Sequence, residues 1–176
     1  MIGAIETSAM LVGLLFAIRA ADLLLGLRLN RFGIVPRTGP GLIGILFSPL
    51  LHGSAAHLGA NAAGLFFLLV ALFLDKRYQP VETIGSIWIV SGLGTWLIGR
   101  PAVHIGASSI IYGLVTYLIS SGFWMRSWRA VFVAILVILS YGGIVYGMMP
   151  QTGIISWEGH LSGALAGWLA ARRQHR

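Results

Sequence analysis

The chain has 176 residues, of which 57% are hydrophobic and 10% are charged, whereas soluble domains carry roughly 25% charged residues. The apolar residues form long blocks, which indicates a polytopic membrane protein. The net charge is +7 with no cysteine. Basic residues lie between the apolar blocks, so they indicate topology and anionic lipid rather than nucleic acid, and disulfides and Cys-ligated metals are excluded.

Six apolar segments predict an all-α bundle of six transmembrane helices. We expect one transmembrane domain over residues 1–176 with no separate soluble domain, and the first segment does not read as a cleaved signal peptide. The fourth and sixth segments are shorter than the ~20 residues of a full crossing, so their N-terminal ends are expected below the membrane surface. The segments are about 6–27, 56–74, 83–99, 106–122, 129–148 and 158–172.

The distribution of basic residues predicts the orientation. Seven lie in one set of loops and the C-terminal tail, and four lie in the opposite loops, which places both termini in the cytoplasm. The second, fourth and sixth segments then begin at the extracytoplasmic side, and the polar motifs that open them share one leaflet. The first set is Lys76, Arg77, Arg126, Arg129, Arg172, Arg173 and Arg176, and the second is Arg28, Arg31, Arg37 and Arg100.

The second segment opens with His57 and Asn61, four residues apart and therefore on one helix face. Both can donate hydrogen bonds to a developing oxyanion. The alternative is an asparagine that bridges two helices. A zinc site is disfavoured, because no His-Glu-x-x-His occurs and no carboxylate lies nearby, so we expect no metal.

The fourth segment opens with Gly106-Ala-Ser108-Ser109. A helix N-terminus presents free backbone N–H groups and partial positive charge, which suit an oxyanion. The alternative is a plain N-cap, in which Ser108 or Ser109 accepts a backbone N–H.

The sixth segment carries a glycine every four residues, at Gly159, Gly163 and Gly167, beside His160. Such a stripe lets transmembrane helices pack closely. If the partner is the fourth segment, His160 lies next to Ser108, which pairs a base with a nucleophile. The alternative is a packing stripe beside an interfacial histidine.

Together these motifs resemble the rhomboid family of intramembrane serine proteases over most of the chain from Arg28 onward. The resemblance implies Ser108 as nucleophile and His160 as general base. It also implies an oxyanion hole from His57, Asn61 and the Ser108 backbone N–H. Further supporting positions are His52, which matches a family position beside the first loop, and Tyr112, which matches a tyrosine that stacks on the catalytic histidine.

Two departures from the family pattern stand out. Ser109 occupies the place of the usual glycine after the serine, and its hydroxymethyl group is expected to bear on the approach of the sixth segment. The first loop lacks a Trp-Arg pair and is predicted to be short.

No carboxylate is expected to orient His160, since Glu158 is two residues away and points elsewhere on a helix. A Ser-His dyad packed against Tyr112 is therefore predicted, with residues 147–157 as a mobile cap. His104 is interpreted as an ordinary interfacial loop residue.

The leading hypothesis is an endopeptidase that cuts transmembrane proteins, with single-span substrates implied by the family. It needs no cofactor and lies in a bacterial cytoplasmic membrane, with its site open to the extracytoplasmic side. One alternative is a catalytically impaired rhomboid-like binder of membrane proteins, which Ser109 leaves open although Ser108 and His160 argue against it. The other is a small transporter or channel, which the histidines and Asn61 alone would support. The sequence does not define the substrate or the oligomeric state.

Overall fold

Helices account for almost all the regular structure. The computed structural model describes residues 2–153 and 155–176, and over these it has seven α-helices and no strand beyond one isolated bridge. The α-helices are α1 (Ile2–Leu25), α2 (Gly39–Phe47), α3 (Ala55–Phe73), α4 (Pro80–Ile98), α5 (Ser108–Trp124), α6 (Trp128–Tyr141) and α7 (Trp157–His175). The 3-10 turns are η1 (Leu29–Phe32), η2 (Ser48–Leu50), η3 (Lys76–Tyr78) and η4 (Gly142–Met148).

The predicted class of helical membrane protein is confirmed. Within the described part of the chain, four stretches are long and apolar enough to cross a membrane: Ile2–Leu25, Ala55–Phe73, Lys76–Ile98 and Trp128–Met148. Helices α5 and α7 are not among these four. Helix α5 has 17 residues, and α7 has a more polar sequence that ends in a basic turn. The count of six crossings therefore stays a prediction.

Two features were not predicted. The fifth segment matches the apolar stretch Trp128–Met148, but it is α-helical only to Tyr141 and then tightens into η4, where Gly142 and Gly143 weaken the α-helix. The prediction of a short first loop is wrong, because residues 26–54 contain η1, α2 and η2. Helix α2 begins after Thr38, whose side chain accepts a hydrogen bond from Gly41 N at 3.1 Å, so an N-cap signal was present in the sequence.

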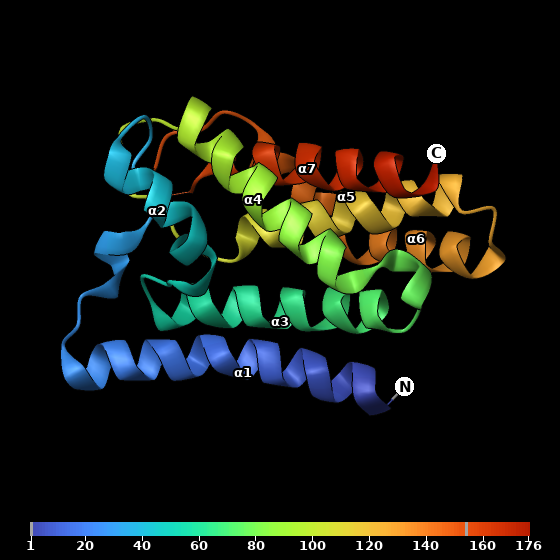
Figure 1. The fold of residues 1–176 in the computed structure, drawn as a ribbon, viewed down its shortest axis with the longest axis horizontal. Coiled ribbons are helices and arrows are strands. Elements are labelled where there is room, and N and C mark those ends of the chain that lie inside the picture. Colours follow the sequence, from blue (N-terminus) through green and yellow to red (C-terminus); the bar gives the residue numbers. More distant parts are fainter. Residues whose placement is uncertain (1, 154) are drawn as a thin grey trace.

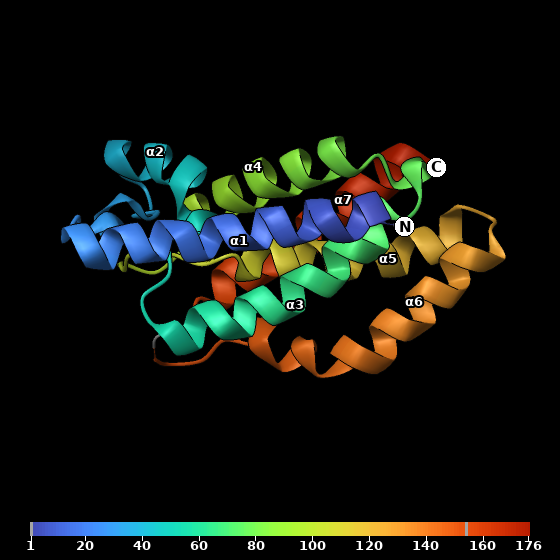
Figure 2. The ribbon, with the colours of Figure 1, turned by 90° about the horizontal axis from the view of Figure 1, so that it is seen from below.

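Helix α5 is the centre of the bundle, in contact with α3, α4, α6 and α7, whereas α1 lies at the edge against α3 (Figure 1). The α5 side chains of Leu114, Tyr117 and Leu118 are fully buried. Helix α6 leans away from α3 along its length, so that the two are far apart near the α5–α6 connection (Figure 2).

Helices α5 and α7 pack backbone to backbone, as the glycine stripe predicts at two of its three positions. A Cβ added to Gly163 would lie 2.1 Å from the carbonyl oxygen of Ser109, and one added to Gly167 would lie 1.9 Å from that of Gly113. A Cβ added to Gly159 would instead lie 2.8 Å from Ser156 Oγ. Any side chain at positions 163 or 167 would therefore push α7 away from α5.

Candidate functional site

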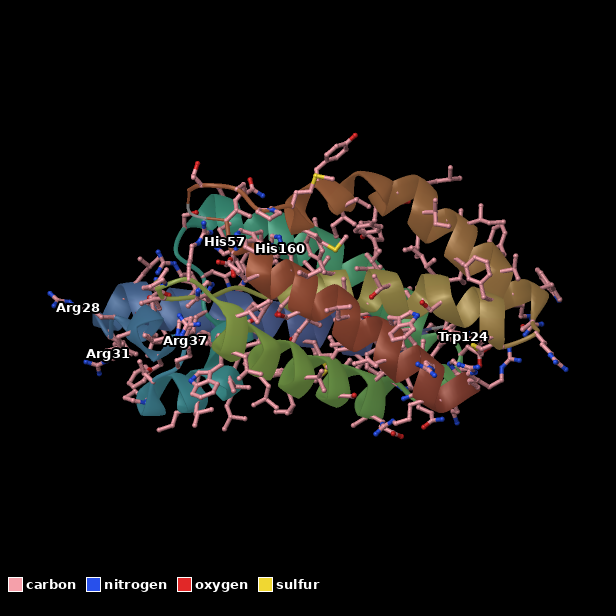
Figure 3. The ribbon with its side chains drawn as sticks, turned by 90° about the horizontal axis from the view of Figure 1, so that it is seen from above. Arg28, Arg31, Arg37, His57, Trp124 and His160 are labelled. Carbon is pink, nitrogen blue, oxygen red and sulfur yellow. The ribbon has the colours of Figure 1, made fainter. Side chains whose placement is uncertain are left out.

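Ser108 and His160 meet where α5 and α7 begin. Ser108 is the first residue of α5 and His160 lies in the first turn of α7. The Ser108 Oγ lies 3.0 Å from His160 Nε2. His160 is buried and Ser108 is half-buried. Figure 3 shows His160 and His57 at one end of the bundle, with Trp124 at the other.

The second hydrogen bond of His160 decides which ring nitrogen carries the proton. Nδ1 lies 2.9 Å from the carbonyl oxygen of Gly147 in η4. Because a carbonyl oxygen only accepts, Nδ1 carries the hydrogen and Nε2 presents its lone pair to the Ser108 hydroxyl. That is the geometry required of a general base.

Tyr112 stacks on the same imidazole, with ring centroids 4.0 Å apart and an interplanar angle of 9°. The ring face is thus fixed by Tyr112 and the ring edge by Gly147. The carbonyl stands where a Ser-His-Asp triad places a carboxylate. This role of Gly147 could not be predicted from the sequence, because a backbone carbonyl has no residue-type signal.

His57 and Asn61 converge on Gly106, two residues before Ser108. A Cβ on Gly106 would lie 2.7 Å from His57 Nε2 and 3.2 Å from Asn61 Nδ2. Gly106 also has a φ of +115°, which side chains rarely adopt. The position therefore admits glycine only, and the two donors lie directly against the backbone that leads into α5.

Asn61 Nδ2 is buried and has no hydrogen-bond partner within residues 2–153 and 155–176. An unpaired buried donor costs roughly 1–3 kcal/mol, so this group is expected to serve a ligand. The alternative in which Asn61 bridges two helices is not observed for this nitrogen.

The N-terminus of α5 carries no side-chain cap. Ala107 occupies the N-cap position and makes no side-chain hydrogen bond, so the N-cap interpretation of Ser108 and Ser109 is wrong. The Ser108 hydroxyl is bonded to His160 instead. First-turn N–H groups of a helix have no intrahelical partner, which leaves the start of α5 able to bind an anion.

His52 and Ser48 support the segment before α5. The Ser48 carbonyl oxygen accepts from Gly106 N at 2.8 Å, and His52 Nε2 accepts from Ala107 N at 3.5 Å. Burial, together with the neighbouring His57, lowers the pKa of His52 to about 4. The ring is therefore neutral near pH 7, as an accepting nitrogen requires.

His104 is a buried structural residue, so its interpretation as an ordinary interfacial residue is wrong. Its Nε2 donates to the Arg100 carbonyl oxygen at 3.1 Å, and its Nδ1 accepts from Ser156 Oγ at 2.6 Å. Ser156 Oγ in turn accepts from Gly159 N at 3.3 Å. This network ties the segment before α5 to the start of α7.

Glu158 points away from His160, as predicted. Its buried carboxylate accepts from Arg100 N at 3.1 Å and pairs with Arg100 Nε at 3.4 Å. The Arg100 guanidinium also donates to the carbonyl oxygens of Gln151 and Ile155. The predicted cap over 147–157 includes residue 154, which lies outside the described residues, and its mobility stays a prediction.

A Cβ added to Gly163 would meet backbone atoms of Ser109, with the carbonyl oxygen at 2.1 Å and Cα at 3.0 Å. With this serine present, Ser108 and His160 are within hydrogen-bond distance. Beside them lies a small cavity of about 20 Å³ lined by Thr95, Ser109 and Ser156 among others. Its polar lining and size suit one water molecule.

This chain is similar to several known proteins. A family model described as the rhomboid domain matches residues 40–176. An uncharacterized protein of Mycobacterium tuberculosis (strain ATCC 25618 / H37Rv) is 42% identical over 169 residues, covering 91% of this chain and 70% of the relative. An uncharacterized protein of Mycobacterium leprae is 35% identical over 170 residues, covering 91% and 67%.

A protein of Acanthamoeba polyphaga mimivirus, provisionally named a rhomboid protein, is 29% identical over 140 residues, covering 75% of each chain. No solved structure matches the chain at a significant level. Because the family model matches most of its length and these relatives are similar to it, the chain belongs to the rhomboid family.

Proposed function

We propose that this protein is an intramembrane serine endopeptidase that cuts transmembrane proteins in or near the bilayer. The observation that carries the proposal is the pair of bonds on His160. Nε2 lies 3.0 Å from Ser108 Oγ, and Nδ1 is held by the Gly147 carbonyl oxygen. A serine with an oriented base is the arrangement of nucleophilic acyl transfer.

The chemistry follows from these positions. Ser108 Oγ attacks the scissile carbonyl carbon while its proton passes to His160 Nε2. Asn61, His57 and the Ser108 backbone N–H stabilise the oxyanion. The peptide C–N bond then breaks, and Nε2–H protonates the leaving amine. Water hydrolyses the acyl-enzyme with the same imidazole as base.

We further propose six crossings, by α1, α3, α4, α5, α6 and α7, with both termini in the cytoplasm of a bacterial cell. The bias of basic residues supports this orientation, and the site then opens to the extracytoplasmic side. Helix α5 has 17 residues and is thus about 26 Å long, less than the ~30 Å hydrocarbon core. Ser108 is therefore expected below the membrane surface. Its substrates are expected to be single-span proteins whose helix unwinds at the cut.

Labelling by a fluorophosphonate tests the proposal. We expect the purified protein to be labelled, and labelling to be lost in Ser108→Ala and in His160→Ala, because attack at phosphorus needs both nucleophile and base. Ser109→Ala serves as the matched control and is expected to remain labelled. A tagged transmembrane substrate should be cut by the wild type and not by Ser108→Ala. Equal product patterns from the two would refute the protease assignment and favour a membrane-protein binder.

Ser109→Gly is expected to change the labelling rate by less than about threefold, which is under ~0.7 kcal/mol. The atoms of Ser109 nearest to the Cβ position of Gly163 are backbone atoms, which glycine shares, and the wild-type spacing of Ser108 and His160 is already suitable. The labelling rates of both proteins are measured from quenched time points at one reagent concentration. A tenfold gain in Ser109→Gly would show that the hydroxymethyl group impairs the dyad.

A further inference from the structure

Two oppositely charged side chains lie within the apolar helix α1. Arg19 Nη1 donates to Asp22 Oδ2 at 2.8 Å, across one helical turn. Both side chains are largely buried, with 18% and 9% of their surface exposed. Arg19 lies almost two turns before the end of α1 at Leu25, which is on the order of 9 Å along the helix axis. Charged groups within a membrane helix are costly, and they mark a functional role by default.

Stability alone does not explain this ion pair. Desolvation offsets most of the attraction in a buried pair, and well-packed apolar side chains often serve as well. Arg19 Nε is also buried without a hydrogen-bond partner among residues 2–153 and 155–176. The pair does fix the geometry of its surroundings, because Asp22 Oδ1 accepts from Leu29 N at 2.8 Å and so holds the chain that leaves α1.

The guanidinium also contacts the loop that leads into α3. The last turns of α1 lie at the same end of the bundle as the start of α3 (Figure 1). There Arg19 Nη2 donates to the Gly53 carbonyl oxygen at 3.4 Å. The next residue is Ser54, the N-cap of α3, whose Oγ accepts from His57 N at 3.1 Å. One guanidinium therefore bridges the carboxylate of α1 and the entry into α3.

The same loop contacts the segment that precedes α5. His52 Nε2 accepts from Ala107 N at 3.5 Å, and a Cβ added to Gly53 would lie 3.8 Å from Ile105 Cδ1. The loop is thus anchored to α1 through the guanidinium and to the start of α5 through His52. Of these two anchors, only the one on α1 comes from outside the candidate site.

We propose that Arg19 and Asp22 are positioning residues for the oxyanion hole. By holding the Gly53 carbonyl, the guanidinium sets where α3 begins, and α3 carries the two side-chain donors, His57 and Asn61. A displacement of about 1 Å at such donors is enough to slow the reaction strongly. The inference rests on the proposed function, and neither charged residue is expected to touch the substrate.

Arg19→Lys tests the bridge, because it keeps the charge and removes the fork. A lysine pairs with Asp22 as a point charge, but its single ammonium group does not hold the carboxylate and the Gly53 carbonyl in one fixed plane. We expect kcat for a tagged transmembrane substrate to fall about tenfold with KM within about twofold, since positioning is lost and binding is not. The unfolding temperature should stay close to that of the wild type, because the ion pair remains.

Arg173→Lys is the matched control, since Arg173 pairs with Glu82 at the exposed end of α7 and exposed pairs contribute little. It should keep wild-type kcat. Asp22→Asn is the second test variant. It retains an acceptor for Leu29 N but releases the guanidinium, so kcat should fall in the same direction. Wild-type kcat in both test variants would overturn the proposal.

A double-mutant cycle with Asn61→Ala tests whether Arg19 acts through the oxyanion hole. We expect the penalty of Arg19→Lys on kcat to shrink from about tenfold to less than about threefold when the donor that it positions is already absent. A merely structural arginine would give equal penalties in both backgrounds, and that result, with an active wild type, would overturn this inference alone. A wild type that neither cuts the substrate nor reacts with the fluorophosphonate would instead refute the protease assignment, and this inference with it.

Discussion

Gly163→Ala is expected to lower kcat on the order of 10²-fold or more, although it alters neither Ser108 nor His160. The new Cβ would lie 2.1 Å from the Ser109 carbonyl oxygen, so α7 must retreat from α5 by about 1 Å to restore ordinary contact. His160 is carried on α7 three residues earlier, and its 3.0 Å bond to Ser108 lengthens with that movement. A misplacement of about 1 Å can cost 10²-fold in rate.

Cleavage of a tagged substrate gives kcat and KM, and thermal unfolding followed by circular dichroism reports on the fold. Gly85→Ala is the matched control, because Gly85 lies within α4 and a Cβ there would meet nothing within 4 Å. It should keep wild-type kcat and gain slight stability, as alanine does over glycine in a helix. If Gly163→Ala kept wild-type kcat, the close approach of α5 and α7 would not be what positions His160 against Ser108.

The parts of the fold that depend on the length of apolar segments could be predicted from the sequence. The six long helices lie within a few residues of the predicted segments at most ends, since most of these segments are continuous apolar blocks. Helix α2 was missed because it is short, and only its Thr38 cap and Pro40 marked it. The fifth apolar stretch was predicted at both ends, but its change from α6 to η4 at Gly142 and Gly143 was not.

The candidate site was predictable where side-chain types carry the signal. His57, Asn61, Ser108, Tyr112 and His160 all fall at one end of the bundle, because each opens or follows the start of a helix. The orientation of His160 was not predictable, since it depends on the backbone carbonyl of Gly147. The burial of His104 was also missed, because only the fold brings it to Ser156, 52 residues away.

Asn61→Ala is expected to lower kcat by about 10²- to 10³-fold with little change in KM, the usual cost of losing one oxyanion-hole donor. Asn61 Nδ2 is buried beside Gly106 and has no partner in the described parts of the chain. Removing it therefore breaks no bond of that nitrogen in the resting protein, and the unfolding temperature should stay equal or rise. Substrate kinetics and thermal unfolding measure the two effects, with Asn30→Ala in η1 as the control.

A helix-bridging asparagine would behave in the opposite way, because its loss would lower the unfolding temperature and leave kcat nearly unchanged. Reduced rate with retained stability is the combination that separates a group held for the transition state from one held for the fold.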